Sequence, residues 1–474
     1  MKSSKQGIFF YLVQTYLRSM LGGAKKVVLT LAIIIIAVAS IVALLAQLNP
    51  LSNGETKQEI YVGVAFCGNT VEEGKQLINK VKSYTNLFVL QSGELQRDFE
   101  SVNELGDYAV AAGMHFLPYF GNYIKQTFSA WLETAKQRWG DNLLGVYYGD
   151  EPAGKMLDDN VELGKTPTGD IVSKTRYGDI KVQKPNNVVI HYEIGGDINL
   201  YQPENFRPGS AAVYATFFPN GTITTDNPTQ NLDASITYGN LMAARPLKDV
   251  NEAAEMFLDR DRENIEYLHN STRVFTSDYV LPWFDYSAGY DVVLSQIGWN
   301  LTFAQQIATV RGAANLQHKD WGAFITWKYD TPPYLDNGLE ILSQMRSAYE
   351  CGAKYIVIFN YYDPAMTPHD TLREEHFKAL ESFWNDIVKN QNVVQGSIRA
   401  DSALVLPGNY GWGMRWEDDR IWGVFNANQT TQQLWQLKQT ALAEHNLKID
   451  IVYESPRFPY EGKYQDVNRL NQQK

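Results

Sequence analysis

Two adjacent carboxylic acids, Asp150 and Glu151, stand shortly after an apolar run and directly before a proline. Two carboxyl groups can cleave a glycosidic bond when one donates a proton and the other stays ionised. The like charge of Asp150, and burial beside Tyr147 and Tyr148, would raise the pKa of Glu151 and hold its proton near neutral pH. The same residues also suit an ordinary helix start, because acids and proline are both favoured in the first turn. The sequence leaves both interpretations open.

A second carboxylate is needed for this chemistry. Asp330, which follows a later apolar run that ends at Trp327, is one candidate. Aspartate is one methylene shorter than glutamate, so Asp330 can act as a nucleophile only if its loop reaches inward. Asp278, Glu94 and Asp363 follow other apolar runs and are reserve candidates. Each of these three, taken alone, is more often a structural acid that accepts hydrogen bonds.

Side chains that could bind a sugar gather near the same run ends. Aromatic rings can stack on the apolar faces of pyranose rings, and polar side chains can bind their hydroxyls. Aromatic residues make up 13% of the chain, so core packing explains their positions equally well. The residues predicted to contact substrate are Asp150, Asp278, Trp283, Gln296, Trp299, Trp327, Tyr329, Tyr362 and Asp363.

Metal and cofactor chemistry finds little support in the sequence. The seven histidines form no ligand spacing such as His-x-x-x-His, and two cysteines offer no zinc cluster. No Gly-x-Ser-x-Gly elbow and no phosphate loop of the form Gly-x-x-x-x-Gly-Lys-Ser/Thr occurs. We therefore predict no cofactor and no metal. A hydrolase that holds a hard metal ion on Asp150, Glu151 and Asp330 is the alternative left open.

Eight apolar runs alternate with helix-like stretches between residues 59 and 390. This alternation predicts an α/β fold, and eight repeats predict a closed (β/α)8 TIM barrel whose catalytic residues stand at the C-terminal ends of the strands. The expected strands are Ile60 to Phe66, Leu87 to Leu90, Phe116 to Phe120, Leu143 to Tyr148, Val274 to Ser277, Val292 to Gln296, Ala323 to Trp327 and Tyr355 to Phe359. The expected helices are Thr70 to Tyr84, Phe99 to Ala112, Phe128 to Trp139, Val250 to Leu268, Leu301 to Leu316, Leu339 to Glu350 and Leu372 to Val388, with a short fifth helix between Tyr279 and Gly289.

The barrel region is longer than the roughly 250 residues of a plain barrel. The excess follows the fourth strand, at about residues 153–248, where apolar residues alternate without a helical period. A hairpin signal, Pro219-Asn220-Gly221, lies within it. We expect a β-rich insertion over the barrel mouth, with a surface loop as the alternative.

A second unit is expected at residues 400–474. Apolar runs at 403–407, 421–425 and 448–453 surround a helix-like stretch at 430–444. Such a small α/β unit buries too little surface to stand alone comfortably, so we expect it to pack on the barrel.

The N-terminus predicts a membrane anchor. Residues 27–48 form an uncharged apolar run long enough to cross a bilayer as one transmembrane helix. Residues 1–26 carry four lysines and one arginine but no acid, which favours a cytoplasmic N-terminus and an extracellular C-terminal domain. The formal net charge of −11 argues against a nucleic-acid partner.

At Glu151 the chain resembles the clan A glycoside hydrolases, in which a glutamate after strand four is the acid/base and a glutamate after strand seven is the nucleophile. Residues 400–474 resemble a reduced form of the amidotransferase-like domain that follows the barrel in large β-galactosidases. Two departures stand out: Asp150 replaces the family's asparagine, and Trp327-Lys328-Tyr329-Asp330 contains no glutamate.

The resemblance implies a membrane-anchored glycoside hydrolase that acts on cell-surface or environmental glycans through Glu151 and Asp330. Its partners would be a glycan and, through residues 27–48, the lipid bilayer. The alternative is a non-catalytic, glycosidase-like protein that binds carbohydrate or serves a structural role at the surface, which the missing glutamate favours.

Overall fold

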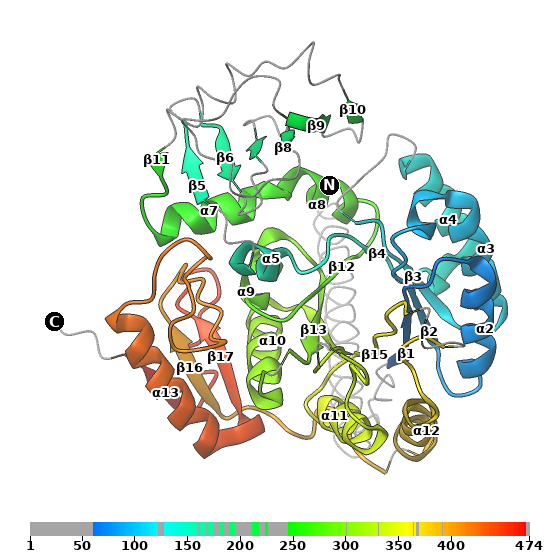
Figure 1. Ribbon diagram of the computed structural model, residues 1–474. Coiled ribbons are helices and arrows are strands. Elements are labelled where there is room, and N and C mark those ends of the chain that lie inside the picture. The colour runs from blue at the N-terminus through cyan, green and yellow to red at the C-terminus, as the bar shows by residue number, and fades with distance from the viewer. Residues whose placement is uncertain are drawn as a thin grey trace, which may run out of the picture. The chain divides into compact units, whose positions relative to one another are not determined.

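The computed structural model describes most of the chain after residue 59 (Figure 1). The predicted cytoplasmic segment 1–26 and transmembrane helix 27–48 lie outside the described residues. Within the described part of the chain, no helix is both long and apolar enough to cross a bilayer. The described residues are 60–121, 128–158, 162–166, 169–174, 180–183, 189–194, 211–217, 223–225, 245–299, 301–329, 331–363, 365, 369–390 and 392–470.

Eight parallel strands form the barrel, in the order β3-β2-β1-β15-β14-β13-β12-β4. Parallel bridges from Phe116 to Leu143 and from Tyr119 to Tyr147 join the two outer strands, so the sheet closes on itself. The predicted (β/α)8 barrel is confirmed by this order. The strands are β1 (Tyr61–Phe66), β2 (Leu87–Leu90), β3 (His115–Pro118), β4 (Val146–Tyr147), β12 (Val274–Asp278), β13 (Val292–Ile297), β14 (Asp320–Ile325) and β15 (Tyr355–Ile358).

The interior of the barrel is a packed core. Apolar and aromatic side chains from alternate strand positions, among them Leu87, Phe275 and Tyr355, are fully buried inside it. A larger cluster fills the space between the strands and the surrounding helices. The barrel is therefore not a pore, and a ligand must bind at its mouth.

Helices surround the strands (Figure 1). The expected Val250 to Leu268 helix is in fact two, because the chain breaks at Asp261, whose carboxylate receives the Arg260 guanidinium at 3.1 Å. A short helix, α5, begins at Pro152, where the acids and the proline suited a helix start. The helices are α2 (Val71–Val81), α3 (Phe99–Ala111), α4 (Phe128–Trp139), α5 (Pro152–Asp158), α7 (Val250–Arg260), α8 (Arg262–His269), α9 (Pro282–Ala288), α10 (Phe303–Gln317), α11 (Gly338–Glu350) and α12 (Glu374–Ser382), the last continued by a π-helical turn, Phe383–Lys389.

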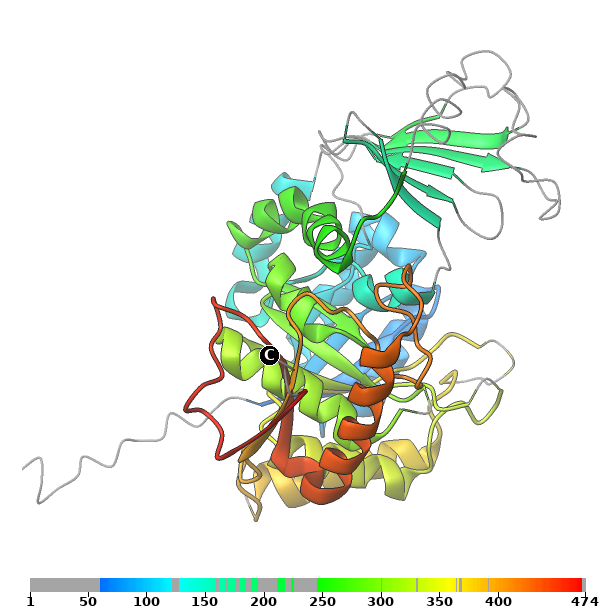
Figure 2. The same ribbon diagram turned by 90° about the vertical axis from the view of Figure 1, so that its left-hand side faces the viewer.

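A second sheet follows α5 in the chain. Its seven strands pair antiparallel in the order β10-β9-β8-β7-β6-β5-β11 (Figure 2). They fall in the range predicted to be β-rich, and β9 pairs with β10 across the predicted hairpin. The strands are β5 (Glu162–Lys165), β6 (Ile171–Lys174), β7 (Ile180–Gln183), β8 (Val189–Ile194), β9 (Ala211–Phe217), β10 (Ile223–Thr225) and β11 (Arg245–Pro246).

The C-terminal unit is a three-stranded parallel sheet with one long helix. Its elements are β16 (Ser402–Leu406), α13 (Gln429–His445), β17 (Ile449–Tyr453) and β18 (Asp466–Arg469), in the order β17-β16-β18. The apolar run at 421–425 forms no regular strand: Ile421 makes single bridges to Trp412 and Phe425, so the segment folds back on itself.

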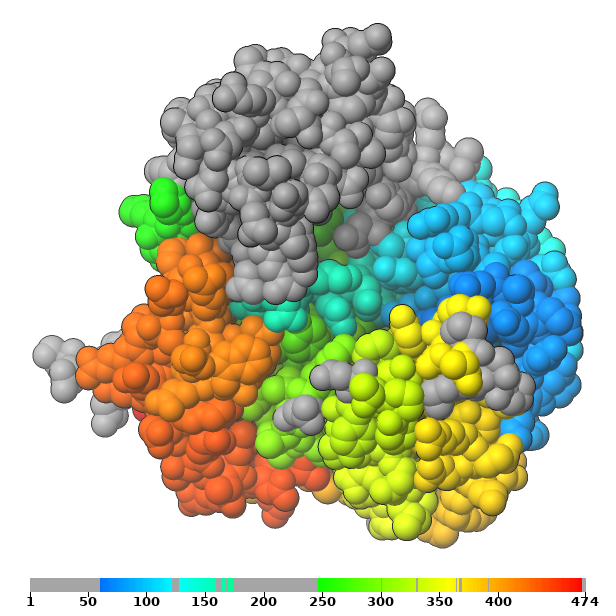
Figure 3. Space-filling view, viewed as in Figure 1, coloured from blue at the N-terminus to red at the C-terminus, as the bar shows by residue number. Residues whose placement is uncertain are grey.

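Polar contacts tie this unit to the barrel. The Arg311 guanidinium of α10 lies 2.7 Å from the Asp450 carboxylate of β17, and both side chains are almost fully buried. The Lys438 ammonium of α13 donates to the Gln305 amide oxygen of α10 at 2.8 Å. Residues of the unit (orange) and of the barrel (green) lie side by side on the surface (Figure 3).

Candidate active site

A tight turn after β4 presents the two adjacent carboxylates. Gly149 and Glu151 both have positive φ, +66° and +52°, so the backbone reverses sharply between them. The Glu151 amide donates to the Ser277 carbonyl of β12 at 2.8 Å, which fixes the turn to the neighbouring strand. Helix α5 then begins at Pro152. The interpretation as a helix start is therefore correct, and it does not conflict with a site at the same residues.

The Asp150 carboxylate is held by side chains from three strands. Its Oδ1 atom accepts hydrogen bonds from the Tyr147 hydroxyl at 2.5 Å and from the Ser277 hydroxyl at 3.0 Å. The Gln91 amide, at the end of β2, lies 3.5 Å from the same oxygen. These donors converge on one oxygen of the carboxylate, so its position at the barrel mouth is fixed by contacts from neighbouring strands.

A chain of polar groups leads from Asp150 to the surface. The buried Gln296 amide donates to the Ser277 hydroxyl at 2.9 Å, and its oxygen accepts from the Trp299 indole at 2.7 Å. Gln296 also hydrogen-bonds the Glu151 side chain, which opposes the upward shift of the Glu151 pKa. The structure thus brings together four predicted site residues and Ser277.

Burial, and then the charge of Asp150, raise the pKa of Glu151 to about 7. This agrees with the predicted role of burial and like charge. The expected contact with Tyr148 is wrong, because the Tyr148 hydroxyl lies 3.0 Å from Asn264 and 3.3 Å from Asp261, among the helices outside the barrel. Glu151 can therefore hold a proton at neutral pH.

Asp278, at the end of β12, is buried and contacts backbone amides. Its carboxylate accepts from the amides of Ala153 at 2.7 Å, Gly154 at 3.1 Å and Val280 at 3.1 Å, and only 1% of the residue is exposed. Burial raises its pKa, and the backbone donors oppose that shift. Asp278 is thus a positioning residue for the start of α5, and the expectation that it contacts substrate or acts as the second carboxylate is corrected.

The other candidate carboxylates are placed differently. Asp330 lies outside the described residues. The Asp363 carboxylate accepts from the Tyr334 hydroxyl at 3.2 Å and from the Ala365 amide at 3.0 Å. The exposed Glu94 lies 3.8 Å from the Arg97 guanidinium.

Aromatic side chains gather at the ends of the sixth, seventh and eighth strands. The Trp327 ring centroid lies 5.8 Å from that of Trp299 and 4.6 Å from that of Tyr361. Trp299 and Tyr361 are 37% and 41% exposed, so these rings face solvent in part. The Trp327 indole N–H is buried without a partner among the described residues.

Three further aromatic predictions have different outcomes. Tyr329 is 43% exposed, with its hydroxyl 3.5 Å from Asp336, and Tyr362 is half-buried. Trp283 is a core residue, because it is 5% exposed and its ring lies 5.6 Å from that of Tyr453 in the C-terminal unit. It therefore packs α9 against β17 and does not line the mouth.

Sequence reasoning missed several polar residues of the site. All but Asp370 stand at or just after the end of a barrel strand, which is the signal that could have found them; Asp370 lies later in the loop between β15 and α12. Ser277 and Gln91 contact Asp150, as described above. Asp370, with φ of +53°, accepts from the Asn360 amide at 3.4 Å, and burial raises its pKa to about 6. Cys67 and Tyr119 complete the set, and the charge of Asp150 adds to burial in raising the pKa of both.

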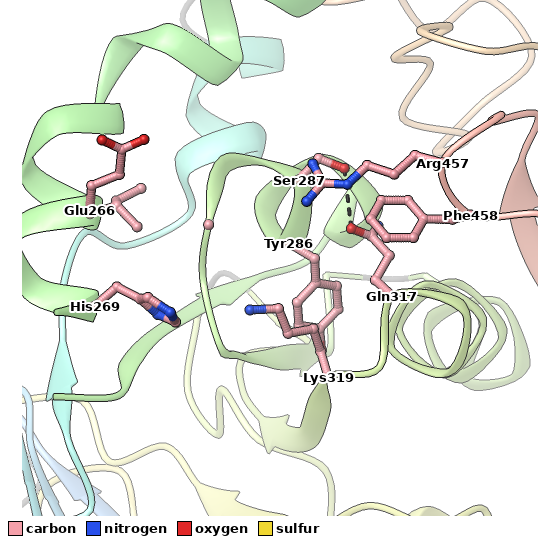
Figure 4. A pocket seen from close by; sticks show the side chains of 10 residues that line it. Glu266, His269, Tyr286, Ser287, Gln317, Lys319, Arg457 and Phe458 are labelled. Carbon is pink, nitrogen blue, oxygen red and sulfur yellow. Dashed lines mark hydrogen bonds between the residues drawn. The ribbon is translucent and has the colours of Figure 1, made fainter.

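No group of three metal-ligating side chains occurs in the part of the chain that the structure describes. A cavity of about 220 Å³ lies elsewhere, between α8, α9 and the C-terminal unit, with His269, Lys319 and Arg457 in its lining (Figure 4). His269 and Lys319 precede β12 and β14, so this cavity opens at the N-terminal ends of the strands. None of the predicted site residues lines it.

No protein-family profile matches the chain, and no curated protein matches its sequence. Among solved structures, a GH5_18 protein from Streptomyces cattleya in complex with GlcNAc shares 9% identity, with 87% of this chain and 98% of that chain covered and a TM-score of 0.45. A GH5_18 protein from Bifidobacterium longum shares 8% identity, with 87% and 97% covered and a TM-score of 0.40. The catalytic domain of a β-amylase from Paenibacillus polymyxa shares 9% identity, with 71% and 99% covered and a TM-score of 0.36. A function for this chain must be argued from the residues at its own barrel mouth.

Proposed function

We propose that this protein is a glycoside hydrolase and that Glu151 is its proton donor. The observation that carries the proposal is the difference in environment between two adjacent carboxyl groups at the C-terminal edge of the barrel. Asp150 receives hydrogen bonds that favour its charge, while burial beside that charge raises the pKa of Glu151 to about 7. Two carboxyl groups kept in opposite protonation states are what cleavage of a glycosidic bond requires.

Each part of the site has a role in this reaction. Glu151 gives its proton to the glycosidic oxygen as the bond to the anomeric carbon breaks. The charge of Asp150 stabilises the positive charge that develops on the sugar ring. The exposed rings of Trp299 and Tyr361 offer faces on which sugar rings can stack.

Replacement of the proton donor tests the proposal. Glu151→Gln keeps the shape of the side chain but cannot donate a carboxyl proton, so hydrolysis of a natural glycan should fall by about 10²–10⁴-fold. An aryl glycoside with an acidic phenol as leaving group needs little protonation and should lose much less. Glu133→Gln, which changes an exposed acid of α4 paired with Lys136, is the matched control.

Unchanged hydrolysis of a natural glycan by Glu151→Gln would overturn the proposal. A wild-type protein that binds glycans but cleaves none in a broad panel would instead support the non-catalytic carbohydrate-binding alternative. The panel should therefore be measured for both binding and turnover.

We further propose that the enzyme is anchored in the cell membrane by residues 27–48 and works on glycans outside the cell. The support is the length of this uncharged run and the basic residues before it. Protease added to intact cells should digest the barrel domain. Complete protection of that domain from the protease would show that it lies inside the cell, contrary to the proposed orientation.

A further inference from the structure

The two carboxyl groups of the site belong to consecutive residues and share their contacts. Ser277 contacts both residues, through its hydroxyl to Asp150 and through its carbonyl to the Glu151 amide. Gln296 contacts both Ser277 and the Glu151 side chain. Glycosidases that use a carboxylate as nucleophile place their two acids on opposite sides of the scissile bond. Asp150 and Glu151 do not have that arrangement.

The reserve carboxylates at the barrel mouth are already engaged. Asp278 is buried against three backbone amides. Asp363 accepts from a tyrosine hydroxyl and a backbone amide of its own loop. Glu94 is exposed beside Arg97. None of these three described acids is presented as a free nucleophile.

Asp150 is suited to a different task. Each hydrogen bond given for its carboxylate among the described residues ends on Oδ1, so the carboxylate is fixed in place. An ionised carboxylate accepts hydrogen bonds and donates none. Consecutive Cα atoms are about 3.8 Å apart. If Glu151 protonates the glycosidic oxygen at C1, Asp150 is therefore close enough to bind the substituent at C2 of the same sugar. That substituent must be a donor, and it gains most from the charge if it becomes positive during the reaction.

We propose that the substrate is a β-linked 2-acetamido sugar, that its acetamido oxygen is the nucleophile, and that Asp150 holds the acetamido N–H. A hydroxyl at C2 would also donate to Asp150, but only the acetamido group supplies a nucleophile as well. This inference rests on the proposed glycosidase function and names its substrate class.

The first step forms one bond and breaks one. The Glu151 carboxyl gives its proton to the glycosidic oxygen, and the C1–O bond breaks with its electron pair going to that oxygen. The acetamido carbonyl oxygen bonds to C1 from the opposite face, which requires the trans arrangement of a β-glycoside. The resulting oxazolinium ion carries a positive charge at its N–H, beside the negative Asp150.

The second step restores the enzyme. Water attacks C1 and gives its proton to the Glu151 carboxylate. The bond between C1 and the carbonyl oxygen breaks, and the acetamido group is regenerated. Two inversions at C1 give a product with the β configuration.

The test compares 4-nitrophenyl β-glycosides of N-acetylglucosamine in which the acetyl group carries none, one, two or three fluorines. Fluorine withdraws electrons from the carbonyl oxygen, so kcat should fall with each fluorine. Asp150→Asn should lower kcat on the parent substrate by about 10²–10³-fold, as removal of a preorganised electrostatic group does. Glu133→Gln should leave it unchanged.

Three results would overturn the inference while the glycosidase function stands: rates independent of fluorination, equal cleavage of the corresponding β-glucoside, or a covalent adduct between an enzyme carboxylate and a 2-fluoro sugar. If no glycoside of any class is cleaved, the proposed function itself fails.

Discussion

Glu151 is under strain at the level of its own backbone. Its φ of +52° lies in the left-handed region, which costs a residue with a Cβ atom about 1–2 kcal/mol. Strain of this kind persists where surrounding contacts enforce it, and such positions cluster at functional sites. The contact that enforces it here is the hydrogen bond from the Glu151 amide to the Ser277 carbonyl. Both the backbone conformation of Glu151 and the ionisation of its side chain are therefore unfavourable.

The charge cost predicts how stability depends on pH. The pKa of Glu151 rises from 4.5 to about 7 on folding, so the folded state binds this proton more tightly. Its contribution is most favourable below about pH 4.5 and is lost as pH rises through about 7. Glu151→Gln removes this loss and should be more stable than wild type by about 1–3 kcal/mol at pH 8. Urea denaturation at pH 5 should show a smaller difference, and a difference that does not change with pH would contradict the assigned cause.

The same shift predicts the pH profile of activity. A general acid must be protonated, so kcat/KM should be sustained below about pH 7 and fall as pH rises above it. Steady-state rates on a natural glycan between pH 5 and 9 measure this. A profile that stays flat to pH 9 would exclude Glu151 as the group that titrates.

At the scale of elements, the start of α5 depends on a carboxylate from another strand. The first amides of a helix lack partners within it, and Asp278 of β12 accepts two of them, from Ala153 and Gly154. Asp278→Ala should cost about 2–4 kcal/mol, because several buried amide donors lose their acceptor. Chemical denaturation measures the loss, and Asp278→Asn, which keeps one oxygen, should lose less. If Asp278→Ala lowers the free energy of unfolding by less than the loss of an exposed ion pair such as Lys136 with Glu133, α5 does not need this contact.

The elements themselves could largely be predicted from the sequence. A predicted apolar run overlaps each barrel strand, because a strand buried on both faces needs apolar residues, although the seventh strand begins three residues earlier than its run. Periodicity could not show the break between α7 and α8, since Asp261 makes its contacts with Arg260 and Tyr148 only in the folded chain. Nor could it show that Trp283 packs on the C-terminal sheet.

The site was predicted less completely for the same reason. Glu151 could be predicted, because it closely follows a strand and stands next to a second acid. The partners of Asp150 could not, because Gln91, Tyr147 and Ser277 come from three strands that only the barrel brings together. A hydroxyl such as that of Ser277 also carries no signal in composition or spacing.

At the scale of the whole molecule, the C-terminal unit and the barrel share one buried ion pair. The Arg311 guanidinium donates to Asp450 and also to the Leu447 and Ile449 carbonyls. Arg311→Met should cost about 3–5 kcal/mol, because it leaves the Asp450 charge buried without its partner. Arg346→Met, in an exposed pair with Glu350 on α11, should cost less than about 1 kcal/mol. Thermal unfolding of both variants gives the comparison, and equal small losses would show that the two parts do not depend on this pair.

The hydrogen bond from the Trp299 indole to Gln296 has a spectroscopic consequence. Trp299 is 37% exposed, and its N–H is linked through Gln296 and Ser277 to Asp150. A sugar ring stacked on this indole would shield it from water while the link to the carboxylate stays in place. Intrinsic fluorescence should therefore shift to shorter wavelength when the mouth is occupied, and Trp299→Phe should abolish most of that shift. The protein would thus carry its own optical reporter of occupancy, readable in a Glu151→Gln variant that binds without turnover.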